Sequence, residues 1–219
     1  MRRVLFIILC VFSVNCLRTQ EPVMCAPVPQ EAEAAEQLVA SIGNQIIDLI
    51  KQTSLPLQQK EDRFREIMTQ NFSLRNIAQF VLGRYWRTAT PEERKKYVEL
   101  FKNVVIEHYV TQLGGYNDEV LEVVKSRPGV AGGIMVATTI YRTDQAPIKV
   151  DWFLRPTKKG LKVFDLFVAG VSLSITQRSE YAAIIRKHRG EIRGLLDEMQ
   201  RQIDTANAKQ AASNKNPPA

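Results

Sequence analysis

The stretch VFDLFVAGVSLSITQRSEYAAIIRKHRG, Val163 to Gly190, is the most informative part of the chain. An apolar strand passes through Gly170 and leads into a capped helix, and the junction carries no set of catalytic residues. The segment therefore indicates a wall of a folded domain and not a reaction centre.

The residues before this stretch predict the rest of a sheet. Segments rich in β-branched residues alternate with turn residues at roughly ten-residue intervals, the pattern of an antiparallel meander. The expected strands are Val120 to Ser126, Ile134 to Arg142, Ile148 to Arg155 and Leu161 to Val168.

The two faces of these strands differ in chemistry. In the third strand Val150, Trp152 and Leu154 share one face and Lys149, Asp151 and Arg155 the other, so part of the second face is expected to meet water. In the fourth strand Val163 and Phe167 are expected to point one way, and Phe164, Leu166 and Val168 the other. Both faces of that strand should therefore be covered by apolar groups.

Helical periodicity flanks the sheet on both sides in the sequence. The expected helices cover about residues 31–52, 58–70, 73–82, 91–113, 176–188 and 191–203. The best start signal is Thr90, Pro91 and Glu93, which form a capping box with proline at the first helical position. This order predicts an α+β domain in which helices pack on a curved antiparallel four-stranded sheet.

The N-terminus predicts export. Arg2 and Arg3 precede an apolar run from Val4 to Val14, which is too short to span a bilayer. Residues 1–26 are expected to be a signal peptide, cleaved between 16 and 26, followed by one domain at 27–205 and a disordered tail at 206–219. Lipidation of Cys16 is disfavoured by the residues before it.

All three cysteines lie in this leader, so the stability of the domain depends on its hydrophobic core and not on an internal disulfide.

The charge is moderately basic. Removing residues 1–26 takes 30 basic and 23 acidic residues to 27 and 22, so the net charge falls from +7 to +5. This balance fits anionic lipid headgroups or an acidic partner better than nucleic acid, although solvated helix faces explain most of it.

Three blocks of sequence carry a family resemblance: LGRYWRTATPEERKKYVELF, VDWFLR and DLFVAGVSLSITQRSEY. Over about residues 32–203 the chain resembles the MlaC-type, or toluene-tolerance, family of periplasmic lipid-carrying proteins. In that family the sheet and helices enclose an apolar cavity that takes phospholipid acyl chains and leaves the headgroup at its mouth.

The resemblance implies a soluble, monomeric periplasmic carrier without cofactor, metal or catalytic residues. Such a carrier moves lipid between an outer-membrane lipoprotein complex and an inner-membrane ABC transporter with MCE-domain subunits. Some relatives are associated with hopanoid synthesis, so a hopanoid carrier stays open, as does a regulatory or scaffold subunit that carries no lipid. The direction of transport also stays open.

Matching motif positions suggest the residues that line the cavity. They are Ile77, Val81, Trp86, Phe101, Val105, Tyr109, Val136, Ile140, Val150, Trp152, Leu166, Val168 and Val171. Ordinary core is the alternative role for each of them. Gly170 is expected to allow a close backbone approach that shapes an opening.

Polar residues near these blocks suggest sharper alternatives. Ser172, Asp165 and either His108 or His188 are a conceivable hydrolytic set, but the chain has no nucleophile elbow. Asp165 is instead expected to accept structural hydrogen bonds from nearby turns. The residues Arg84 to Arg87 are candidates for holding a headgroup at the cavity mouth.

Overall fold

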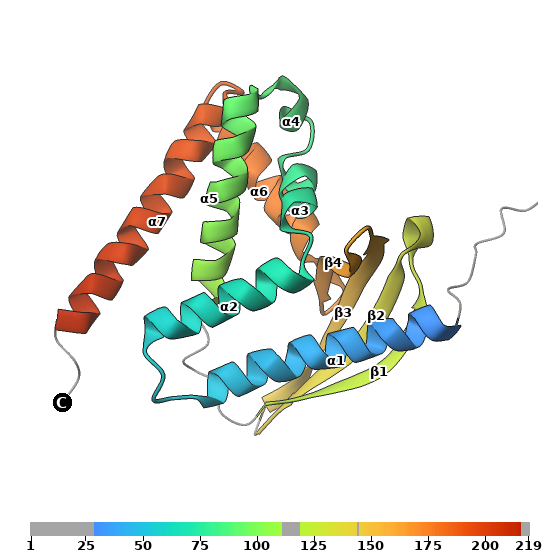
Figure 1. The fold of residues 1–219 in the computed structure, drawn as a ribbon. Coiled ribbons are helices and arrows are strands. Elements are labelled where there is room, and N and C mark those ends of the chain that lie inside the picture. Colours follow the sequence, from blue (N-terminus) through green and yellow to red (C-terminus); the bar gives the residue numbers. More distant parts are fainter. Residues whose placement is uncertain (1–28, 111–118, 144, 216–219) are drawn as a thin grey trace, which may run out of the picture.

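The computed structural model describes residues 29–110, 119–143 and 145–215, and these form an α+β fold (Figure 1). The helices are α1 (Pro29–Lys51), α2 (Leu57–Asn71), α3 (Leu74–Leu82), α4 (Tyr85–Thr88), α5 (Pro91–Val110), α6 (Leu173–Lys187) and α7 (Ile192–Lys215). The strands are β1 (Val120–Pro128), β2 (Ile134–Arg142), β3 (Gln145–Thr157), β4 (Gly160–Val168) and β5 (Val171–Ser172), and a short 3-10 helix, Val130–Gly132, joins β1 to β2.

The sheet is an antiparallel meander in the order β1-β2-β3-β4-β5. The four expected strands are present, and the fifth arises because β5 pairs back onto the end of β4 through Phe167 and Ser172. Two residues with positive φ, Ala169 (49°) and Gly170 (82°), form the turn between them. Nothing lies within 4 Å of a Cβ built on Gly170. The predicted close backbone approach there is therefore wrong, and the glycine serves the turn.

A β-bulge changes the facing of β4. Phe153 pairs with Asp165, but the next residue of β3, Leu154, pairs with Val163, so Phe164 is an extra residue. The bulge reverses the alternation, and Val163 shares a face with Leu166, the partner of Trp152. The predicted grouping of Val163 with Phe167 is therefore wrong.

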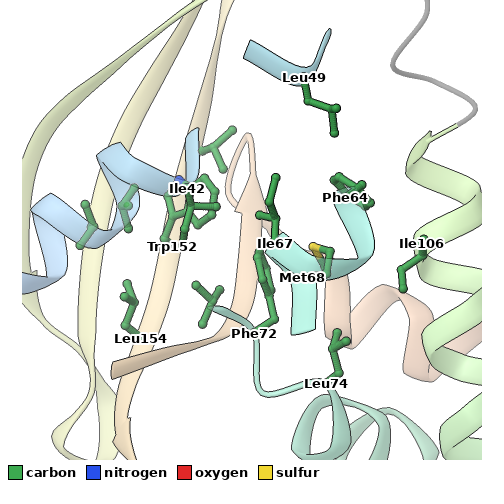
Figure 2. Close-up of a cluster of buried hydrophobic side chains, with 14 of the residues drawn as sticks. Ile42, Leu49, Phe64, Ile67, Met68, Phe72, Leu74, Ile106, Trp152 and Leu154 are labelled. Atoms are coloured by element: carbon green, nitrogen blue, oxygen red, sulfur yellow. The ribbon is translucent and has the colours of Figure 1, made fainter. Parts of the chain in front are cut away.

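The first hydrophobic core lies between the sheet and the helices α1 and α2 (Figure 2). Trp152 from β3 lies beside Ile42 from α1, and its ring centroid is 6.3 Å from that of Phe72, which follows α2 (Figure 2). The Trp152 indole donates to Thr138 Oγ1 at 3.1 Å, and that hydroxyl donates to the Val150 carbonyl at 2.8 Å. Its buried polar atoms are thus paired, as a stable core requires.

The second hydrophobic core lies among α3, α4, α5, α6 and α7 and contains no residue of the sheet. The rings of Tyr97, Phe101 and Tyr181 pack in tilted and edge-to-face contacts, with centroids 5.9 to 6.4 Å apart. The Tyr97 hydroxyl, fully buried, donates to the Ala78 carbonyl at 3.1 Å. These helices therefore pack mainly on one another, while α1 and α2 cover the sheet (Figure 1).

Helix ends follow local signals in part. The capping box at α5 is confirmed, because the Thr90 amide donates to Glu93 Oε2 at 2.9 Å and the Glu93 amide donates to Thr90 Oγ1 at 3.1 Å. Gly83 ends α3 with φ of 59°, as predicted.

The start of α6 and the end of α7 differ from the predicted helix boundaries. α6 starts earlier than predicted, because Ser172 caps it. α7 continues to Lys215, so the prediction of a tail disordered from residue 206 is wrong for 206–215. The signal peptide and the predicted end of the α5 helix near residue 113 fall outside the described residues. Among the helices described, none is both long and apolar enough to cross a membrane.

Candidate ligand cavity

A cavity of about 1110 Å³ opens between the helices α2, α3, α5, α6 and α7, with the end of β4 at its base. Its lining is largely apolar, and the apolar residues are Leu57, Met68, Phe72, Leu74, Ile77, Val81, Phe101, Val104, Val105, Tyr109, Val110, Leu166, Leu173, Tyr181, Ile184 and Ala206. The polar residues are Glu61, Glu107, His108, Asp165, Ser174, Gln177, Glu180, Glu198, Arg201, Gln202 and Thr205. The volume exceeds the roughly 300 to 1,000 Å³ of ordinary small-molecule pockets.

The base of the cavity is braced by Asp165. Its Oδ1 accepts from the amides of Leu166 at 2.9 Å and Ser174 at 3.0 Å, and its Oδ2 accepts from the Ser172 hydroxyl at 2.5 Å. Ser172 Oγ in turn accepts from the Ile175 amide at 3.0 Å and caps α6. The prediction that Asp165 accepts structural hydrogen bonds is confirmed, and the network ties β4 to the start of α6.

Aromatic rings form part of the wall. Phe101 and Tyr181 meet edge to face with ring centroids 6.4 Å apart. Burial raises the pKa of the Tyr181 phenol, and the nearby Glu180 carboxylate raises it further. The phenol, which is already neutral near pH 7, is therefore still harder to ionise at this position.

Charged residues gather on α2, α5 and α7 around the same cavity. Glu61 pairs with Arg65 at 2.7 Å, and Glu198 pairs with Arg201. Burial raises the pKa of Glu107, and the Glu61 carboxylate adds to that shift. The cavity lining thus combines a largely apolar surface with charged and hydrogen-bonding side chains, among which carboxylates outnumber the one arginine, Arg201.

Comparison with known proteins decides the family. The model of the MlaC protein family matches residues 40–201. The chain belongs to the MlaC family.

A solved structure supports the same fold for this MlaC-family protein. That solved structure is of a phospholipid-binding protein from Ralstonia solanacearum in complex with a phospholipid. Its TM-score against this chain is 0.67, and the two sequences are 23% identical. The match covers 81% of this chain and 98% of that one.

The residues predicted to line a cavity divide between four places: the cavity, the two cores and the exposed surface. Ile77, Val81, Phe101, Val105, Tyr109 and Leu166 line the cavity, and their contact with lipid stays a prediction. Val136, Val150 and Trp152 are buried in the first core, with Ile140 and Val168 packed against it. Trp86 packs against the second core, and Val171 is 57% exposed.

Leu166 of β4 lines the cavity, but the predicted residues of β2 and β3 lie outside it for a physical reason. α1 and α2 cover the face of the sheet that carries Trp152, so its branched side chains meet other side chains instead of an empty space. Sequence reasoning missed the contributions of α2, α6 and α7, of which Leu57, Ile184 and Ala206 are examples. Their helical spacing is the same as that of ordinary core residues, so no local signal identifies them.

The described contacts do not bring a histidine to Ser172 and Asp165, as the conceivable hydrolytic set would require. Ser172 and Asp165 touch, but both are used in capping α6. His108 lies on the cavity wall against the Tyr109 ring, and His188 is the C-terminal cap of α6. Within the described ranges, no group of three or more His, Cys, Asp or Glu residues could hold a metal ion.

Proposed function

We propose that this MlaC-family protein carries phospholipid, with the acyl chains in the cavity that α2, α3, α5, α6 and α7 line and the headgroup at its mouth. The observation that carries the proposal is the apolar cavity of about 1110 Å³ in a member of this family. The bound phospholipid in the similar Ralstonia solanacearum structure supports the choice of ligand.

The energetics require such an enclosure. Two acyl chains contain about thirty methylenes, and each one kept from water is worth ~0.8 kcal/mol, so the tails represent on the order of 20 kcal/mol. A carrier that moves them through water must cover most of that surface. Leu74, Ile77 and Val81 from α3 and Leu173 and Ile184 from α6 are among the apolar residues of the lining that would cover the tails.

The carrier works in the periplasm and exchanges lipid with two membrane complexes. We assign it an outer-membrane lipoprotein complex and an inner-membrane ABC transporter with MCE-domain subunits as partners, following the family. The alternatives are a polycyclic hopanoid as cargo and a scaffold subunit that holds the transporter without carrying lipid. The polar side chains of the base act in capping, so we assign no enzymatic role.

Native mass spectrometry of protein purified without detergent tests the proposal. One phospholipid per protein, identified after extraction, is the expected result. A bound hopanoid would support the carrier function and would identify a hopanoid, not phospholipid, as the ligand. Protein that is empty, takes up no lipid from vesicles, and still binds the transporter would refute the carrier and favour the scaffold.

A further inference from the structure

Positive charge is concentrated at one end of the molecule. The segments 84–96 and 186–193 contain nine Lys and Arg and three Asp and Glu, which makes +6 of the net +7 of the whole chain. These two segments, which lie about a hundred residues apart in the sequence, are therefore strongly basic.

The two segments meet at a surface pocket of about 660 Å³. Arg84 and Arg87 line it from the α4 side, and Arg186 and Arg189 line it from the end of α6. Tyr85, Thr88 and Gly190 complete its lining, and no carboxylate does. It shares no residue with the lipid cavity.

Local structure holds two of the arginines in place. The Arg84 guanidinium lies 4.9 Å from the centroid of the buried Tyr85 ring and donates to its hydroxyl at 3.0 Å. Arg189 has a φ of 58°, uncommon for a residue with a side chain, and the Gly190 amide donates to the Ile185 carbonyl at 2.9 Å. The end of α6 therefore turns in a fixed geometry that places Arg189 on the pocket.

The four guanidinium groups are also available. The ion pairs found among the described residues involve none of them. The carbonyls of Trp86 and Arg87 accept from Arg94 at 2.7 and 3.2 Å, so the end of α4 is satisfied by a side chain from α5. Arg84 and Arg87 are exposed and are not needed for that role.

We propose that this arginine pocket is a binding site for a phosphate group. Each arginine guanidinium can donate two parallel hydrogen bonds to two oxygens of a phosphate group. Several guanidinium groups around one concave surface therefore favour phosphate over a single carboxylate. The phosphate comes either from the headgroup of an anionic lipid at a membrane surface or from a free phosphate in solution. A membrane source gives the protein a docking surface at the end where its positive charge gathers.

Two probes separate the sources: inorganic phosphate, followed by NMR of the arginine side-chain Nε–Hε groups, and sedimentation with phosphatidylglycerol-containing vesicles against pure phosphatidylcholine vesicles. The test variant is Arg87→Gln with Arg186→Gln. The matched control is Lys95→Gln with Lys96→Gln, which removes the same charge from exposed residues of the same basic end that do not line the pocket.

The test variant should weaken binding to anionic vesicles about tenfold or more, while the control changes it by less than about threefold. A variant with Arg84→Lys and Arg186→Lys keeps the charge and loses the forks, and should also bind more weakly. Binding of inorganic phosphate with no preference for anionic vesicles assigns the site to free phosphate. Equal losses in test and control variants, or no binding of either probe, would overturn the proposal, and so would binding only to an acidic protein.

Discussion

The substitution Val105→Trp tests whether the cavity is empty space for lipid or part of an ordinary core. Val105 is half-buried, lines the cavity and packs against both hydrophobic clusters. The matched control is Val136→Trp, the same change at a fully buried position in the first core.

The expected magnitudes differ at the two sites. In the cavity the indole can turn into the open space, so the free energy of unfolding of lipid-free protein should change by less than about 1 kcal/mol. The ring takes the room of about four methylenes, which at ~0.8 kcal/mol each weakens lipid binding by about 3 kcal/mol, or roughly a hundredfold. In the core the same ring overpacks, which costs ~1 to 3 kcal/mol or more.

The assay measures thermal melting of lipid-free protein and bound-lipid stoichiometry in parallel. We expect Val136→Trp to lower the Tm by several degrees, since 1 kcal/mol corresponds to about 2 to 4 °C in a chain of this size, and to keep lipid binding where it folds. We expect Val105→Trp to melt near the wild type and to retain less lipid. If Val105→Trp melts much lower yet retains lipid, the assignment of α5 as a cavity wall is wrong.

Four further outcomes are expected. Val171→Glu should leave both stability and lipid binding unchanged in the same two assays, because that side chain points into solvent. Asp165→Ala should lower the free energy of unfolding by about 2 to 4 kcal/mol in urea titrations, because three donors lose their acceptor; an unchanged midpoint would refute its bracing role. Thr90→Ala should cost ~1 kcal/mol through the lost cap of α5, and Thr90→Ser should restore most of it. Gel filtration with light scattering should give a monomer at micromolar concentration, and a dimer through the sheet would favour the scaffold.

Local features of the fold were predictable because their causes lie within a few residues. The Thr90 and Glu93 pair starts α5, and Gly83 ends α3 at a positive φ. β2 runs over Ile134–Arg142 as its β-branched residues predict. In β3 the alternation of buried Trp152 with more exposed neighbours follows the two-residue repeat of a strand.

The bulge and the long last helix were not predictable from the same signals. Phe164 adds one residue to β4, and its position depends on the pairing with β3. Nothing in the apolar run of that strand marks the extra residue. With or without a bulge at Phe164, apolar side chains would lie on both faces of β4. The polar composition from residue 206 likewise suggested disorder, whereas α7 continues to Lys215.

The sequence by itself determined the class of the fold, the family, and the residues able to face an apolar environment. Only the tertiary structure decided which of them line a space: α1 and α2 cover Trp152 and Val136, while Val105 and Leu166 border the opening between α2 and α7. It also brought Arg84 and Arg189 to one pocket. The physical reason is one of distance along the chain. Helix caps, turns and the alternation of side chains along a strand depend on interactions between residues a few positions apart, whereas the core, the cavity and the arginine pocket depend on which distant segments come into contact.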